Sequence, residues 1–163
     1  PPQEVKTVED LYLFGLHIEQ YRHATRLSED YYLEGLKRDD GDLRINNAYG
    51  ELLLRRGRFE ESKKYFKKAI EKATIKNPNP VNSQPYFNLG VADIYTGDYD
   101  EAYDNFYKCI WCNDNKSGAF YYLSAIAFAR KNFTTASGVV GRFERCSVHR
   151  VCNYGRDGSG NRK

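Results

Sequence analysis

The chain has 163 residues, of which 40% are hydrophobic and 29% charged, enough for one helical domain with a continuous core. No apolar run is long enough to predict a membrane-spanning helix, and no signal-peptide pattern opens the chain. The formal charge of +3 is concentrated in residues 142–163, which carry six basic and two acidic side chains. A basic tail on a near-neutral body does not predict a nucleic-acid-binding protein, which carries its positive charge on one folded face.

The sequence contains four cysteines and no methionine. The lack of methionine indicates that the chain is a piece of a longer protein. Four cysteines without secretory features favour reduced thiols. We therefore expect a cytoplasmic protein.

The first helical hairpin is predicted between residues 8 and 42. Residues 1–6 lack apolar periodicity and predict a linker, whereas from Val8 to about Ala24 apolar residues recur at helical spacing. A second helix follows, and we expect the hydroxyl of Ser28 to cap it by accepting a bond from a free amide of its first turn. The acidic turn at residues 39–42 ends this helix.

The stretch at residues 49–70 recurs forty residues later, at residues 89–110. The matched positions are Gly50 and Gly90, Gly57 and Gly97, Phe59 and Tyr99, Phe66 and Phe106, and Ala69 and Cys109. A fixed spacing of small and large apolar residues is the signature of a structural repeat. The insertion at residues 75–82 contains two Asn-Pro pairs, which turn the chain and lengthen this repeat.

Each later repeat is predicted as two helices joined by a tight turn. The predicted helices are about 43–56, from 59 onward, 84–96, 99–111, 116–130 and 133–145. Gly57 makes the first of these turns, and in the last one Lys131-Asn132 replaces glycine, with asparagine tolerating left-handed geometry. Ser83 is expected to cap the helix at 84–96, and Asp98 with Glu101 to form a capping box.

This order of small, turn, aromatic, aromatic and small positions resembles the tetratricopeptide repeat (TPR), a helical hairpin. The resemblance implies an all-α fold, an α-solenoid of about four hairpins over residues 7–145. The repeats would lie at about 8–42, 43–82, 83–116 and 117–145. Residues 146–163 lack a helical stripe and predict a flexible basic tail. For function, the resemblance implies a non-catalytic scaffold that binds a protein or peptide.

The resemblance also implies a groove, because five positions of each first helix line the concave face in TPR proteins. Carried over by register, the candidate groove residues are Tyr12, Leu16, Arg44, Asn47, Glu51, Arg55, Gln84, Phe87, Val91, Tyr95 and Tyr121, with Leu54, Ile94, Ala125 and Phe128 beside them. Aromatic and arginine side chains commonly dominate the energy of protein interfaces. The alternative is that several of these rings pack between helices.

A second candidate surface is the polar stretch at residues 15–26. Its candidate contact residues are His17, Gln20, Tyr21, Arg22, His23 and Arg26. His17 and Tyr21 are four residues apart and so share one face of a helix. These groups either close the N-terminal end of the solenoid or contact a ligand or another domain.

The cysteines raise the question of a metal site. Cys109 and Cys112 form a CxxC pair, and Cys146, His149 and Cys152 follow in the tail, a pattern shared with structural zinc sites. Cys109, however, occupies the small core position of its repeat. We therefore favour core packing and predict no metal and no cofactor. No catalytic triad, nucleophile elbow or phosphate loop predicts an enzyme.

Residues 8–136 are also similar to one bacterial group, through the GLHIEQYRHATR stretch, the KNPNP turn and the DEAYDNFYK run. In that group such repeats follow a β-sandwich similar to galactose mutarotases, in proteins of uncharacterised function. The similarity implies an alternative role as an accessory or docking domain of a larger carbohydrate-related protein, with the sandwich as an intramolecular partner. A homodimer is a further alternative, because an uncapped solenoid end exposes apolar surface.

Overall fold

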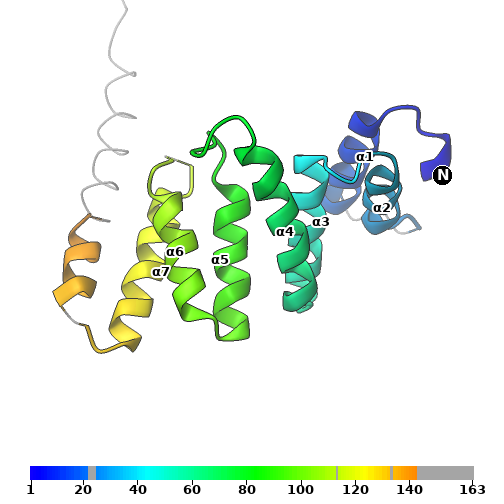
Figure 1. Ribbon diagram of the computed structural model, residues 1–163. Helices are drawn as coiled ribbons and strands as arrows, with labels where there is room; N and C mark the ends of the chain where they lie inside the picture. Colours follow the sequence, from blue (N-terminus) through cyan, green and yellow to red (C-terminus); the bar gives the residue numbers. More distant parts are fainter. Residues whose placement is uncertain (22–24, 113, 133, 143–163) are drawn as a thin grey trace, which may run out of the picture.

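The computed structural model describes residues 1–21, 25–112, 114–132 and 134–142. These residues form helices and connecting turns, and they contain no strand (Figure 1). A short 3-10 turn, η1 (Pro2–Glu4), comes first. The α-helices that follow are α1 (Val8–Tyr21), α2 (Ser28–Arg38), α3 (Leu43–Arg55), α4 (Phe59–Thr74), α5 (Gln84–Thr96), α6 (Tyr99–Cys109) and α7 (Lys116–Ala129), and residues 134–142 are helical as well.

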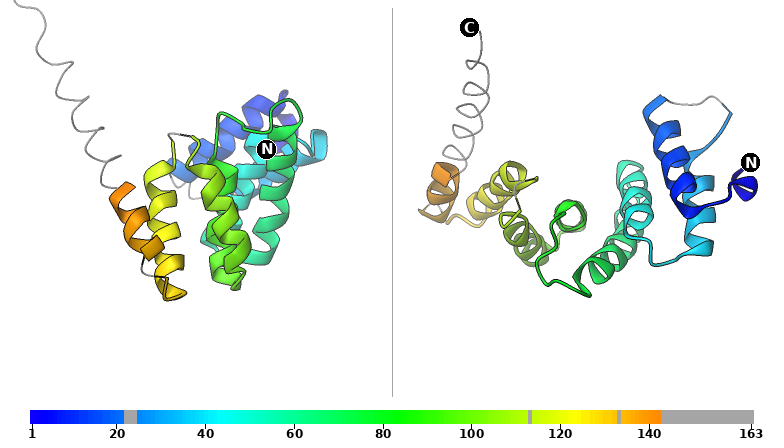
Figure 2. Two further views of the ribbon diagram at one scale, coloured as in Figure 1. Left: turned by 60° about the vertical axis from the view of Figure 1, so that its left-hand side comes forward. Right: turned by 90° about the horizontal axis from the view of Figure 1, so that it is seen from above.

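Consecutive helices form hairpins that stand side by side (Figure 1). Seen from above, the hairpins follow an arc, with α1, α3, α5 and α7 toward its inner side and α2, α4 and α6 toward its outer side (Figure 2). Each helix packs mainly on its neighbours in the chain, as α4 does on α3 and α5. Contacts restricted to adjacent repeats define a solenoid. The predicted all-α solenoid is therefore confirmed.

Inside each of the first three hairpins, an aromatic ring of the second helix lies directly on a glycine of the first. The pairs are Gly15 with Tyr32, Gly50 with Phe66, and Gly90 with Phe106. A side-chain carbon added at Gly50 would come within 2.6 Å of the Phe66 ring, too close for any real contact. All three rings are fully buried, so this close approach of paired helices is the physical reason for the repeated spacing.

The turn between paired helices requires a residue in the left-handed region. Gly57 (φ 77°) and Gly97 (φ 90°) supply it, as the sequence predicts for the turn glycine. In the last described turn Lys131 (φ 58°) takes this conformation, so the expectation that Asn132 would do so is wrong. Lys131 lies thirty-four residues after Gly97, and the register of the hairpin therefore outweighs the higher tolerance of asparagine for this geometry.

Three predicted helix caps are wrong. Ser28 is buried as the first residue of α2, and no side chain caps that helix. Ser83 holds the N-cap position of α5, but the side-chain oxygen of Asn82 accepts from the first amide of the helix at 2.9 Å. Asp98 precedes α6 without capping it, because its carboxylate accepts from Lys63 Nζ at 2.5 Å. A charged donor forms a stronger hydrogen bond than a backbone amide does.

The predicted linker at residues 1–6 is tied to the first hairpin. Arg38 Nη1 donates to the carbonyl oxygen of Val5 at 2.6 Å, and Arg38 Nη2 donates to that of Gln3 at 3.2 Å. The start of the chain is thereby held against the C-terminal end of α2.

No helix in the described part of the chain is long and apolar enough to cross a membrane. Residues 22–24, which were predicted to extend α1, and the predicted tail at 146–163 lie outside the described residues. The predicted repeat and domain boundaries stay predictions.

Candidate interaction surface on the inner face

Ion pairs between α1 and α3 form the first part of the inner face. Arg44 Nη1 lies 2.5 Å from Glu9 Oε2, and the guanidinium carbon of Arg44 stands 5.2 Å from the centroid of the Tyr12 ring. The hydrogen bond to Glu9 is the main reason why the pKa of Arg44 is raised. Further along the same helices, Arg55 donates to Glu19. Both arginines that the sequence placed in the groove are thus engaged by carboxylates of α1.

A cluster of side-chain amides follows between α3 and α5. Glu51 Oε1 accepts from Asn88 Nδ2 at 2.7 Å, from Asn47 Nδ2 at 2.9 Å and from Gln84 Nε2 at 3.4 Å. Asn88 Nδ2 also donates to Asn47 Oδ1 at 3.1 Å, and Asn115 Nδ2 donates to Gln84 Oε1 at 3.0 Å. Because each of these groups has a partner in the neighbouring hairpin, the cluster joins the second hairpin to the third.

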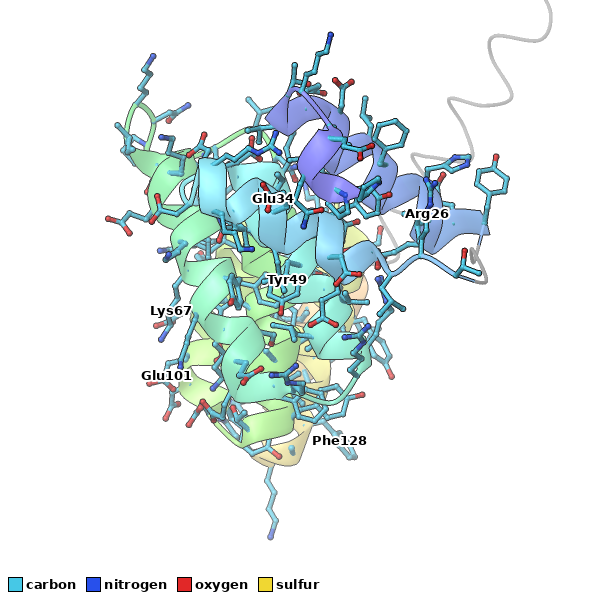
Figure 3. All side chains as sticks on the ribbon, turned by 90° about the vertical axis from the view of Figure 1, so that its right-hand side faces the viewer. Arg26, Glu34, Tyr49, Lys67, Glu101 and Phe128 are labelled. Carbon is cyan, nitrogen blue, oxygen red and sulfur yellow. The ribbon has the colours of Figure 1, made fainter. Side chains whose placement is uncertain are left out.

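The inner face of α5 and α7 carries exposed aromatic rings instead. Tyr95 on α5, Tyr121 on α7 and Phe128 on α7 have exposed fractions of 65%, 63% and 65%. The Tyr95 ring stacks on Phe59, with 4.5 Å between centroids and 5° between planes, which holds it in place. Figure 3 shows Phe128 on one side of the array and Lys67, from the outer helix α4, on the other.

Tyr122 connects these exposed rings to the core. Its ring stacks on Phe106 with centroids 4.7 Å apart and meets Phe87 edge-on at 5.8 Å. Burial raises the pKa of Tyr122, and the neighbouring Tyr95 and Tyr121 raise it further. The rings of Tyr121 and Tyr122 meet edge-on, with their centroids 5.4 Å apart. The set Tyr95, Tyr121, Tyr122 and Phe128 is called the aromatic strip below. Large exposed rings are typical of surfaces that bind a partner.

The other predicted groove residues of α1 and α5 are less accessible. Leu16, Phe87 and Val91 are half-buried. The Phe87 ring contacts the Phe106 ring edge-on at 5.6 Å and lies so close to Gly118 that a side chain there would clash with it. Phe87 therefore packs between helices, which is the alternative reading of these rings.

Sequence reasoning missed two carboxylates of the inner face, Glu9 and Glu19. Each lies thirty-five residues before a predicted groove position, Arg44 and Leu54 respectively, at the same place in the repeat. Extending the register comparison to every groove position of the first hairpin would have found both.

The second predicted surface lies at the N-terminal end of the array, near Arg26 in Figure 3. The rings of His17 and Tyr21 lie with their centroids 4.5 Å apart, as the four-residue spacing predicts. Both residues are exposed, and so are Gln20 and Arg26. Arg26 borders a hollow of about 500 Å³ beside the first hairpin. The other two predicted residues of this surface, which lie outside the described residues, are Arg22 and His23.

The same face of the first helix is covered in every later hairpin. Its residues there are Ile45, Tyr49 and Leu52 in α3, Pro85, Leu89 and Ala92 in α5, and Ala119, Leu123 and Ile126 in α7, and all are buried. In α1 the equivalent residues are Asp10, Phe14 and His17, and all are exposed. No preceding hairpin in the described residues covers this face, and its side chains are partly charged.

Both described cysteines are free thiols, of which Cys112 contacts the inserted loop and Cys109 contacts the residue that follows it. Cys109 Sγ donates to the Ser83 carbonyl oxygen at 3.7 Å, and Cys112 Sγ donates to that of Pro80 at 3.1 Å. Burial, with a smaller contribution from Cys112, raises the pKa of the Cys109 thiol to about 12 and so disfavours the thiolate that zinc needs. Among the described residues, no group of three or more His, Cys, Asp or Glu side chains is placed to hold a metal. The tail residues of the zinc pattern, which lie outside the described residues, are Cys146, His149 and Cys152.

One part of the chain matches a known protein family. Residues 42–110 match the family model described as "Tetratricopeptide repeat". This match spans the second and third hairpins, which are the two hairpins joined by the amide cluster.

Solved structures share the whole arrangement of helices at low sequence identity. The chain matches pilF of Pseudomonas aeruginosa over 86% of its length, with a TM-score of 0.73 and 18% identity. It matches MamA of Desulfovibrio magneticus RS-1 over 88%, with a TM-score of 0.73 and 14% identity, and BtubC of P. vanneervenii over 99%, with a TM-score of 0.75 and 17% identity. These matches cover 61%, 77% and 71% of the respective proteins, so this chain spans about three fifths of pilF. At such identities the likeness shows the fold alone.

Proposed function

We propose that this tetratricopeptide-repeat solenoid is a non-catalytic scaffold that holds a protein or peptide on its inner face, with the aromatic strip as the anchor. The observation that carries the proposal is the exposure of Tyr95, Tyr121 and Phe128, which lie on helices at the inner side of the arc (Figure 2). Burial of one such ring by a partner contributes about 1.5–3 kcal/mol, which is the range of an interface hot spot.

The ion-paired half of the inner face has a different part in this proposal. Arg44 and Arg55 are already bound to carboxylates of α1, and a ligand would have to displace those carboxylates to use them. We assign to these ion pairs the role of holding α1 and α3 in a fixed arrangement, so that the inner face is preformed. A preformed surface loses little conformational entropy when it binds.

The test is a selection of peptides on the intact chain, followed by direct binding. Peptides enriched from a random display library are labelled, and their affinities for the wild type and for the Tyr95→Ala and Tyr121→Ala variants are measured by fluorescence anisotropy. We expect each substitution to weaken binding at least about tenfold, because a buried ring is lost. Tyr107→Ala is the matched control, since Tyr107 is a 46% exposed tyrosine on the outer helix α6.

If every selected peptide binds all three variants and the wild type with equal affinity, the inner face is not the binding surface. Loss of binding in the Tyr107→Ala variant alone would move the binding surface to the outer helices.

A second candidate function is that of an accessory or docking domain in a larger, carbohydrate-related protein. The exposed inter-hairpin face of α1, with Asp10, Phe14 and His17 where later hairpins bury apolar residues, favours it. Hydrogen exchange of the full-length gene product, compared with that of this chain, tests the idea. Docking predicts slower exchange in α1 within the longer protein, whereas identical exchange would speak against it.

We retain the cytoplasm as the proposed compartment. The support is that the described cysteines are free thiols, and free thiols persist under reducing conditions. Fluorescence imaging of the tagged full-length gene product checks this, and an envelope signal would contradict it.

A further inference from the structure

The aromatic half of the inner face is uncharged. By register its groove positions in α5 are Gln84, Phe87, Val91, Ile94 and Tyr95, and those in α7 are Gly118, Tyr121, Ala125, Phe128 and Ala129. None of them ionises near neutral pH. The nearest charged groove residues lie on α3. Arg44 and Arg55 are held in pairs with α1, and the Glu51 carboxylate accepts hydrogen bonds from the side-chain amides of Asn47, Gln84 and Asn88. This half of the face therefore complements an uncharged ligand segment.

The rings of α7 are spaced along one line. Tyr121, Ala125 and Phe128 are three and four residues apart, so they share one helix face. Phe128 follows Tyr121 by seven positions, which corresponds to about 10.5 Å along the helix axis. A polyproline II helix presents equivalent side chains every three residues, or about 9.3 Å. One turn of such a ligand therefore fits the separation of the two rings.

The strip also combines rings with hydroxyl donors. The rings of Tyr121 and Tyr122 meet edge-on with their centroids 5.4 Å apart, and Tyr95 and Tyr121 are exposed. A phenol hydroxyl can donate one hydrogen bond beside its own ring. The carbonyl oxygens of a polyproline II segment make no internal hydrogen bonds and can accept such bonds, whereas most carbonyls of an α-helical ligand are already used within the helix.

We propose that the aromatic strip binds a proline-rich segment of a partner protein in the polyproline II conformation. The inference rests on the proposed function and specifies the class of partner. Proline rings pack on the faces of Tyr121 and Phe128, and the tyrosine hydroxyls donate to the ligand carbonyls. Aromatic-lined grooves recognise proline-rich segments in this way because the ligand is already extended and loses little entropy on binding.

The experiment compares three labelled probes of equal length: decaproline, a neutral helical peptide rich in alanine and leucine, and an acidic peptide. Each is titrated by fluorescence anisotropy into the wild type and the Tyr121→Ala, Tyr121→Phe, Phe128→Ala and Tyr107→Ala variants. We expect decaproline to bind with the highest affinity. Tyr121→Ala and Phe128→Ala should weaken it at least about fivefold, and Tyr107→Ala should leave it unchanged.

Tyr121→Phe separates the hydroxyl from the ring. Loss of one donor to a ligand carbonyl should weaken decaproline binding about three- to fivefold while leaving circular dichroism unchanged. An unchanged affinity in this variant would overturn the assignment of the hydroxyl as donor and with it the preference for polyproline II.

The remaining outcomes distinguish the inference from the function on which it rests. Binding of the helical or the acidic peptide, weakened by Tyr121→Ala, without binding of decaproline would overturn the inference and keep the inner face as the binding surface. If no probe binds in a ring-dependent way, the inference is overturned. The proposed function then falls too if peptides selected by display also ignore Tyr95 and Tyr121.

Discussion

The two halves of the inner face use the same repeat positions for opposite purposes. In the first two hairpins Glu9 binds Arg44 and Glu19 binds Arg55, so polar groups are paired within the chain. In the third and fourth hairpins the same face carries exposed rings such as Tyr95 and Tyr121. The position of a residue in the hairpin repeat thus sets the face on which its side chain lies. It does not set whether that side chain pairs with another residue of the chain or stays exposed. The second use leaves apolar area in water, and this area provides the driving force for binding.

The comparison assumes that both halves rest on equivalent cores. Phe66→Ala in the second hairpin and Phe106→Ala in the third should each lower the free energy of unfolding by about 3–5 kcal/mol, because each removes a fully buried ring. Urea denaturation followed by circular dichroism measures both. A loss below about 1 kcal/mol in either variant would show that its ring contributes little to the stability of the core. Tyr107→Ala serves as the exposed control.

The joint between the halves depends on a buried ammonium group. Lys63 Nζ lies 3.0 Å from Asp93 Oδ1 and 2.5 Å from Asp98 Oδ2, and Asp93 is buried. Lys63→Ala should destabilise the protein by about 2–3 kcal/mol, since it leaves the Asp93 carboxylate without its counter-charge. Lys64→Ala, at an exposed neighbouring position, is the matched control in the same thermal melt. Equal melting temperatures for the two variants would contradict a structural role for Lys63.

Acid should weaken the contact between the first and second hairpins, which adjoins the ion-paired half, more than it weakens the aromatic half. The Arg56 guanidinium, aided by the Tyr49 hydroxyl, lowers the pKa of Glu29 below its ordinary value of 4.5. Because the pKa of Glu29 is lower in the folded than in the unfolded protein, the stabilisation is fully present above the unfolded pKa. It is lost as the pH falls from there through the folded pKa. We expect a loss of about 1 kcal/mol between pH 6 and pH 3, seen as faster hydrogen exchange in α2 and α3 than in α7. Uniform acceleration across all helices would contradict this.

The smallest effect should come from the exposed ion pair at Arg55. Its side chain is about half exposed, so Arg55→Ala should change the free energy of unfolding by less than about 1 kcal/mol. Affinity for a selected peptide should stay within about twofold of wild type, against the tenfold loss expected for Tyr95→Ala. A larger loss for Arg55→Ala than for Tyr95→Ala would reverse the roles assigned to the two halves.

Much of the fold could be predicted from the sequence because the helices of each repeat pack in the same way, which requires small and large residues at fixed positions. Gly50 and Phe66 recur as Gly90 and Phe106, since only a glycine lets the ring lie between the paired helices. The helix caps could not be predicted in the same way. A carboxylate caps a helix only if no stronger donor occupies it, and for Asp98 such a donor is Lys63 on another helix.

The candidate groove stays a prediction from register, and the structure adds which of its side chains are engaged within the chain. Register alone places Arg44, Arg55, Tyr95 and Tyr121 on one face. Whether each side chain is engaged or accessible depends on its neighbours across the hairpin boundary. Glu9 and Glu19 occupy both arginines, while the tyrosines keep about two thirds of their surface exposed.

The sequence by itself determined the class of fold and the positions of the turns between paired helices, because these follow from local spacing of small, large and polar residues. The tertiary structure decided which half of that face is closed by internal ion pairs and which half is open. It also decided that Asp10, Phe14 and His17 of α1 are exposed in the part of the chain that the structure describes. These properties depend on contacts between residues more than twenty-five positions apart, and a periodic pattern within single helices carries no information about them.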